Sequence, residues 1–266
     1  MMLRPPAVAG LFYPAQPQEL GVEVSTLIAE AQAAAIHPKA LIVPHAGYVY
    51  SGPVAASAYA TLQSLHADIH RVVLLGPVHR VPARGLAATS AKAFETPLGK
   101  VNVDRAAVEQ ALQLPQVEIN DEAHAPEHSL EVHLPFLQTV LYDFSIVPFA
   151  VGDATAPEVA EVLELLWGGA ETLIVVSSDL SHYLPYAVAR RIDQATTDSI
   201  LQLDLLPSHE QACGATPING LLAAATRHGL KPQLLDLRNS GDTAGDKSRV
   251  VGYASIAFCD RCEDHA

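Results

Sequence analysis

The sequence predicts an α/β fold, built as a single three-layer α/β/α domain over residues 1–266 with a mainly parallel central sheet. Short apolar runs rich in β-branched residues alternate with longer segments of helical spacing. This alternation is typical of a parallel sheet that helices cover on both faces. No linker-like stretch, composition shift or internal repeat divides the chain. With 266 residues, 49% of them hydrophobic, the chain is long and apolar enough to bury a large core.

Strands are predicted where a short apolar run ends at a turn signal. The run 40–43 ends at Pro44, and the run 71–75 ends at Gly76. Two further stretches lie on either side of a turn at 97–99, and we interpret them as antiparallel excursions from the sheet. In chain order, the predicted strands are 40–43, 71–75, 86–89, 100–103, 144–151, 173–176, 234–237 and 250–258.

Helices are predicted from apolar spacing together with residues that start and stop helices. Pro53 suits the first turn of a helix that Ser51 can cap, and Asp104 suits the start of the next. Pro135 should kink or restart the segment that it interrupts, and Gly229 is a typical stop. In chain order, the predicted helices are 53–65, 104–114, 127–141, 157–167, 186–203 and 217–228.

Charge and composition exclude several classes of protein. The formal net charge of −13 argues against a nucleic-acid partner, because phosphate backbones need a basic surface. The high hydrophobic content excludes a disordered chain, and no apolar run approaches the length of a membrane span. The N-terminus lacks the unbroken apolar stretch of a signal peptide. Three cysteines, an odd count, suit a reducing cytosol, so we expect a cytoplasmic protein.

Histidines follow three of the predicted strands directly. His45 comes after the first strand, His79 after the second, and Asp179 and His182 after the strand 173–176. The carboxyl ends of parallel strands meet at one edge of a sheet, where ligands bind, so we expect these side chains to converge. Such a set predicts either a metal site or an acid–base site, since imidazole is a common metal ligand that also titrates near neutral pH. Two histidines with a carboxylate are the pattern of non-haem Fe(II) sites.

Three other clusters have both a functional and a purely structural interpretation. The segment 124–135 holds His124, His128 and His133 among glutamates, but it is not an H-E-x-x-H zinc motif. In the polar loop 239–246, Asp242 is able to supply a carboxylate to a metal, or the loop is only a surface turn. A C-x-x-C pair at Cys259 and Cys262 lies in residues 259–266, which we expect to form a flexible tail. Cys213 receives no functional assignment.

Six motifs together resemble the Memo family, which in prokaryotes is also called protein B of AmmeMemoRadiSam systems. They run from near the N-terminus to about residue 258. The matching segments are RPPAVAGLFYP at 4–14, PHAGYVYSG at 44–52, LGPVH at 75–79, EHSLEVHLPF at 127–136, SSDLSH at 177–182 and VGYA at 251–254. The resemblance implies the fold of the class III extradiol dioxygenases, a single α/β/α domain that uses non-haem iron.

The resemblance also implies roles for individual residues. His45 and His79 would be metal ligands, and His182 would be the acid–base histidine with Asp179 beside it. Vertebrate Memo proteins carry a cysteine in the C-terminal loop where Thr243 stands here, so Asp242 or water would complete the ligand set. We expect His128 and Tyr48, which lie in two of the matching segments, to bind the substrate.

Three functions are compatible with these residues. The first is a metal-dependent oxidoreductase of the dioxygenase type, with Fe(II) as the expected cofactor, Zn or Cu as alternatives, and an unknown small molecule as substrate. The second is a non-catalytic binding or assembly partner with a vestigial site, which the missing cysteine favours. Its ligand would be a peptide, or a companion protein of the AMMECR or radical-SAM type. The third is a metal-assisted hydrolase in which His182 activates a bound water.

Overall fold

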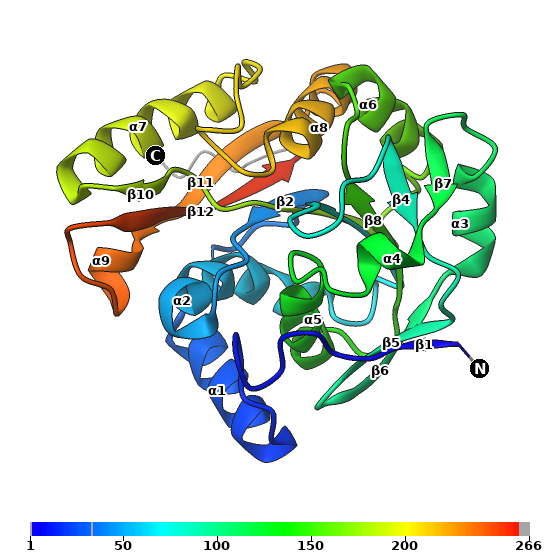
Figure 1. The fold of residues 1–266 in the computed structure, drawn as a ribbon, viewed down its shortest axis with the longest axis horizontal. Coiled ribbons are helices and arrows are strands. Elements are labelled where there is room, and N and C mark those ends of the chain that lie inside the picture. Colours follow the sequence, from blue (N-terminus) through cyan, green and yellow to red (C-terminus); the bar gives the residue numbers. More distant parts are fainter. Residues whose placement is uncertain (1, 33, 261–266) are drawn as a thin grey trace.

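The computed structural model describes residues 2–32 and 34–260, and its centre is a parallel sheet. The four middle strands are β8 (Ser145–Val151), β3 (Arg71–Pro77), β9 (Thr172–Ser177) and β2 (Ala40–Val43), in that spatial order and all parallel. Their side chains are almost entirely buried, which explains why they read as continuous apolar runs rather than as alternating patterns. The predicted fold class, α/β with a mainly parallel central sheet, is confirmed (Figure 1).

Further strands extend the sheet on both sides, antiparallel beside β2 but parallel where β6 meets β8. On one side β12 (Val250–Cys259) pairs with β2, with β11 (Lys231–Asn239) and with β10 (His182–Leu184). On the other side β6 (Gly99–Val103) pairs with β8 and forms a hairpin with β5 (Ala93–Thr96). The predicted turn at 97–99 is therefore present. It joins β5, which was not predicted, to β6, whereas the prediction placed the strand 86–89 before this turn. The remaining short strands are β1 (Leu3–Arg4), β4 (Leu86–Ala88) and β7 (Val117–Ile119).

Helices cover both faces of the sheet. On one face lie α1 (Pro17–Glu30), α2 (Tyr48–Tyr59) with the 3-10 helix η1 (Ala60–Leu65), and α5 (Leu134–Val140) (Figure 1). On the other face lie α6 (Ala156–Leu165), α7 (Tyr186–Leu201) and α8 (Ala215–His228), with α3 (Arg105–Ala111) beside α6. The short elements α4 (Asp121–His124), η2 (Glu131–His133) and α9 (Ser240–Thr243) belong to loops at the edge of the sheet. No helix in the described ranges is both long and apolar enough to cross a bilayer.

The helix boundaries confirm some sequence signals and correct others. The Asp104 side chain caps α3, and Gly229 ends α8 with a left-handed φ of 68°. Helix α1 was not predicted, although Pro17 in its first turn and the spacing of Leu20 and Val24 are typical signals. The prediction that Pro53 starts a helix is wrong, because the carbonyl of Gly47 already accepts the first helical hydrogen bonds and α2 begins five residues earlier.

The predicted helix 127–141 is also wrong over its first third. The carboxylate of Glu127 accepts from the backbone N–H groups of His128 and Ser129 at 2.9 Å each, as a capping side chain does before a helix. The chain becomes helical only at η2, and Pro135 then lies in the first turn of α5. The non-helical segment 125–130 is therefore a structured loop, and it carries two residues of the candidate site.

The prediction that a flexible tail starts at Cys259 is wrong. Cys259 is the last residue of β12 and only 1% exposed, so the flexible tail does not start there. Residues 261–266, and with them Cys262 of the C-x-x-C pair, lie outside the described residues.

Two glycines are expected to respond to alanine with opposite signs. A Cβ at Gly152, which follows β8, would lie 1.9 Å from the carbonyl oxygen of Ala83, so Gly152→Ala should destabilise the fold by about 3 kcal/mol. At Gly21, inside α1, the nearest atom would be 3.8 Å away, and Gly21→Ala should stabilise it by about 0.5–1 kcal/mol through helix propensity. Urea unfolding of both variants measures the two changes, and a loss of stability at both positions would contradict the packing described for Gly21.

Candidate metal centre

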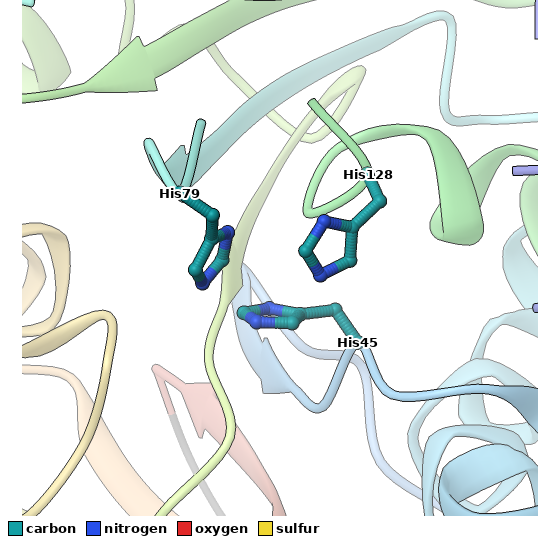
Figure 2. Close-up of side chains that lie close together, drawn as sticks. All are labelled: His45, His79 and His128. Atoms are coloured by element: carbon teal, nitrogen blue, oxygen red, sulfur yellow. The ribbon is translucent and has the colours of Figure 1, made fainter. Parts of the chain in front are cut away.

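The candidate site lies where three parallel strands end. His45 is the second residue after β2, His79 the second after β3, and Asp179 the second after β9. Because these strands are neighbours and parallel, the loops that follow them meet at the same edge of the sheet. The predicted convergence of the strand-end histidines is therefore present (Figure 2).

A third imidazole completes the cluster. His128, from the loop between α4 and η2, faces the rings of His45 and His79 (Figure 2). The ring centroids are 5.1 Å apart for His45 and His79, 5.4 Å for His45 and His128, and 4.6 Å for His79 and His128. One ring nitrogen of each residue lies within 4.8 Å of the others, close enough for all three to bind one ion after small side-chain adjustments.

Glu127 orients two of the three rings. Its Oε1 atom is 2.9 Å from Nδ1 of His79 and 3.3 Å from Nδ1 of His128, and the backbone N–H of His79 donates to Oε2 at 2.6 Å. Burial alone would raise the pKa of Glu127, but the hydrogen bonds from His79 and Ser129 lower the pKa to about 2. The carboxylate is thus ionised and only accepts, so Nδ1–H of His79 is the donor in this contact.

Ser177, at the end of β9, orients the third ring. The Ser177 hydroxyl donates to the carbonyl of Ser129 at 2.6 Å, so its oxygen accepts from Nδ1 of His45, also at 2.6 Å. His45 is only 2% exposed, and burial, reinforced by the nearby His79 and His128, holds its pKa well below the usual range. Its imidazole is therefore neutral with the lone pair on Nε2, which is the form that binds metals.

The donor set fits a transition-metal ion. Three neutral imidazoles suit Zn, Cu, Fe or Ni, and none of these three side chains is a carboxylate of the kind that completes the two-histidine iron pattern. Nδ1 of His45 and Nδ1 of His79 are each hydrogen-bonded to an oxygen atom, the arrangement that metal-ligating histidines usually have around them. Three protein ligands also leave coordination positions for a substrate or water, as catalytic metal sites do.

His182 and Asp179 lie at the same pocket but do not bond each other as expected. The pocket has a volume of about 660 Å³, and both residues line it beside the three clustered histidines. The Asp179 carboxylate accepts from the backbone N–H of His45 at 2.7 Å, while the His182 ring bonds the backbone of Leu180. Burial raises the pKa of Asp179 to about 7, against the opposing effect of the His45 hydrogen bond, and burial lowers the pKa of His182.

Two predicted site residues lie elsewhere. The Asp242 carboxylate accepts from the hydroxyl of Tyr186 at 2.5 Å and from the backbone N–H of Asn239, and it faces a separate cleft between α7 and β11. Asp242 is not in the group that could hold a metal ion, whose third member is His128. Tyr48 is 3% exposed and its hydroxyl donates to the carbonyl of Val132, so it packs in the core instead of binding substrate; the pocket is lined by Tyr50.

Two neighbours of the cluster carry no role in the sequence analysis. Glu127 is only 1% exposed, and its sequence signal is a glutamate directly before a histidine in a non-periodic segment. Cys213, just before α8, places its sulfur 3.4 Å from Nε2 of His45 and accepts from the backbone N–H of Asp179. No local pattern in the sequence predicts that contact, because 168 residues separate the cysteine from the histidine.

Comparison with known proteins identifies the family. The family model described as Memo-like protein matches residues 4–257, nearly the whole described chain. The chain belongs to the Memo family. Relatives that are MEMO1 family proteins come from Aquifex aeolicus (37% identity, covering 97% of this chain and 100% of the relative), Sulfolobus acidocaldarius (38%, 97% and 100%) and Archaeoglobus fulgidus (39%, 96% and 99%). The resemblance inferred from the six motifs is thereby confirmed.

A solved structure shares the fold of this Memo-family chain at much lower identity. The crystal structure of the uncharacterized protein JW3007 from Escherichia coli K12 superposes with a TM-score of 0.56 at 14% sequence identity. It covers 82% of this chain and 98% of its own. At that identity the likeness supports the α/β architecture alone.

Removing the acceptor that holds two rings should weaken metal binding in this Memo-family protein. Glu127→Gln replaces an ionised carboxylate with a neutral amide that has only one acceptor oxygen. The amide therefore holds the rings of His79 and His128 less strongly than the carboxylate does. Affinity for Zn(II) or Fe(II) should fall by about 10–100-fold, as it does when other outer-shell partners are lost. Competition with a chelator of known affinity measures the change. Wild-type affinity in this variant would show that Glu127 does not orient the rings for binding.

Proposed function

We propose that this protein is a metal-dependent oxidoreductase of the non-haem iron type, which acts on a small molecule in the histidine pocket and works in the cytoplasm. The observation that carries the proposal is the convergence of His45, His79 and His128. In two of these residues, His45 and His79, Nδ1 is hydrogen-bonded to an oxygen atom. Bringing three imidazoles together is expensive for a structural core, because buried polar groups must be desolvated. It is expected where a cation binds.

The three imidazoles would hold Fe(II), with Zn(II) and Cu as alternatives for the same donors. Bound iron would supply a Lewis acid together with a centre able to exchange electrons with an oxidant. The pocket of about 660 Å³ has room for a small molecule beside the cluster, and its aromatic residues Phe12, Tyr50 and Tyr253 would exclude water from the bound substrate.

His182 is the residue that would move a proton. Burial lowers the pKa of His182, so its ring is neutral near pH 7, and its bond to the Leu180 backbone occupies one nitrogen. The other nitrogen is left to take a proton from a substrate hydroxyl. Asp179 would act indirectly, since its carboxylate holds the backbone N–H of His45 and so fixes the loop that carries this ligand.

Metal content tests the proposal directly. Protein purified without oxygen and loaded with Fe(II) should hold about one iron per chain, whereas a His45→Ala/His79→Ala variant should hold almost none. With ascorbate as reductant, the iron-loaded wild type should consume oxygen faster than the variant. Equal and near-zero iron in both proteins would reject the proposal. Iron binding without any oxygen consumption would instead favour the metal-assisted hydrolase, which should work unchanged under argon.

One observation favours a second candidate function, a binding or assembly partner. Leu11 and Val49 are 81% and 61% exposed, and they adjoin Phe12 and Tyr50, which line the pocket. Exposed apolar side chains around a pocket suit a protein surface that covers it. A companion of the AMMECR or radical-SAM type would be such a partner. Co-purification with these companions, combined with no oxygen consumption by the iron-loaded protein, would support this function over catalysis. Absence of any complex would reject it.

A further inference from the structure

The mouth of the histidine pocket carries two arginines, although the chain as a whole is strongly acidic. Arg80 and Arg249 both line the pocket, in a protein whose formal net charge is −13. Long-range steering by so acidic a chain disfavours anions, but local charges decide which ligand is held once it arrives. The two guanidinium groups therefore point to a ligand whose charge is opposite to theirs.

Arg249 contacts the aromatic ring of Tyr183, a residue whose backbone conformation is unusual. Its guanidinium carbon lies 5.2 Å from the ring centroid of Tyr183, within the range of a cation–π contact. Tyr183 has φ of 58°, a left-handed conformation that is uncommon for a bulky residue. Its strand β10 pairs with β12 beside Arg249, and His182 precedes it directly. The same irregular strand pairing thus places His182, Tyr183 and Arg249 together at the pocket.

Arg80 belongs to the loop that follows β3. It comes directly after His79, whose backbone N–H and ring are both held by Glu127. Arg80 lines the same pocket as His79 and His128. The two cations consequently approach the pocket from different loops.

The carboxylates at the pocket do not cancel these charges. Asp179 is only 4% exposed, and its Oδ1 atom accepts from the backbone N–H of His45 at 2.7 Å. Asp246 is exposed and accepts from the backbone N–H of Ser248 at 2.5 Å. Both carboxylates that line the pocket are therefore already engaged by backbone N–H groups.

We propose that the pocket selects small molecules that carry a carboxylate or phosphate group, with Arg249 and Arg80 binding that group. The forked guanidinium matches the two oxygens of either anion, and the walls formed by Phe12, Tyr50 and Tyr183 suit an apolar body attached to it. The reactive part of the ligand would then extend toward His182 and the three clustered histidines. This inference rests on the proposed function only in taking the pocket as the substrate site.

Ligand-observed NMR titration of the purified chain tests the inference with three probes of similar size: benzoate, phenyl phosphate and neutral benzamide. Wild type should bind at least one of the two anions about tenfold more tightly than benzamide. Arg249→Gln and Arg80→Gln should each remove most of that preference, and added salt should weaken anion binding. Arg227→Gln is the matched control, because Arg227 is an exposed arginine on α8 that pairs with Glu164. It should behave as wild type.

The outcomes separate this inference from the proposed function. Tighter binding of benzoate assigns a carboxylate, and tighter binding of phenyl phosphate assigns a phosphate. Equal binding of benzamide, no binding of any probe, or wild-type affinity in both pocket-arginine variants would overturn the inference. The His45→Ala/His79→Ala variant should keep the arginine-dependent preference while it loses iron. If the wild type binds no metal but still prefers the anions, the proposed function is rejected and this inference stands.

Discussion

Replacing His128 with alanine is expected to lower the affinity of this protein for Fe(II) or Zn(II) by more than about 100-fold. The change removes one of three converging donors, which should cost more than the 10–100-fold loss typical of an outer-shell partner. Asp242→Asn is the matched comparison, since its carboxylate bonds Tyr186 and the backbone of Asn239 in a separate cleft. That variant should bind metal within about twofold of wild type.

Equilibrium dialysis of the metal-free proteins against buffered metal measures both affinities. Circular dichroism of the His128→Ala variant serves as the check on folding, because His128 makes few contacts with the core other than Phe12. A large loss in Asp242→Asn, with His128→Ala unaffected, would return the third ligand to the C-terminal loop and contradict the geometry described here.

Breaking the buried ion pair between Arg4 and Glu131 is expected to lower the free energy of unfolding by about 3–5 kcal/mol. Arg4 is 5% exposed and Glu131 is fully buried, so Arg4→Met leaves an uncompensated carboxylate in the interior. Glu131 also accepts from the backbone N–H groups of Ala7 and Val8 and from the Tyr13 hydroxyl. Urea unfolding measures the loss.

An exposed ion pair on α8 provides the comparison. Arg227 pairs with Glu164 at 3.6 Å, but its side chain is 57% exposed, so Arg227→Met should change stability by less than about 1 kcal/mol. Arg4 also donates to the carbonyl oxygens of His124 and Glu127, in the loop that carries the site. Arg4→Met should therefore weaken metal binding as well. Unchanged stability would mean that the N-terminal segment is held mainly by its apolar contacts.

The parallel core and two of the metal-site histidines were predictable from the sequence because their signals are local. The apolar runs at 40–43 and 71–75 end within two residues of His45 and His79, and a parallel sheet brings such ends together whatever the rest of the chain does. Each strand and the histidine that follows it are adjacent in the sequence. Their prediction therefore required no information about contacts with distant residues.

His128 was expected to bind substrate, and its place beside His45 and His79 was not predicted, because that place depends on contacts across the fold. Helical spacing in 127–141 predicted a helix from Glu127, but the chain becomes helical only at Glu131. The Glu127 carboxylate bonds the N–H groups of His128 and Ser129 and also His79, which lies 48 residues away, so no local pattern predicts the path of this loop. Asp242 was misplaced for a similar reason, because its partner Tyr186 belongs to another helix.

The pocket draws its walls from almost the full length of the polypeptide, from Phe12 near the start to Tyr253 close to the end. Nearly the whole chain must therefore be synthesised before the pocket lining is complete. Until then, the histidines of the first half lack His182 and Arg249 beside them. A chain released at its midpoint would carry all three clustered histidines but neither β9, which lies between β2 and β3, nor the C-terminal part of the lining. The complete pocket is therefore expected to form only after the chain has left the ribosome.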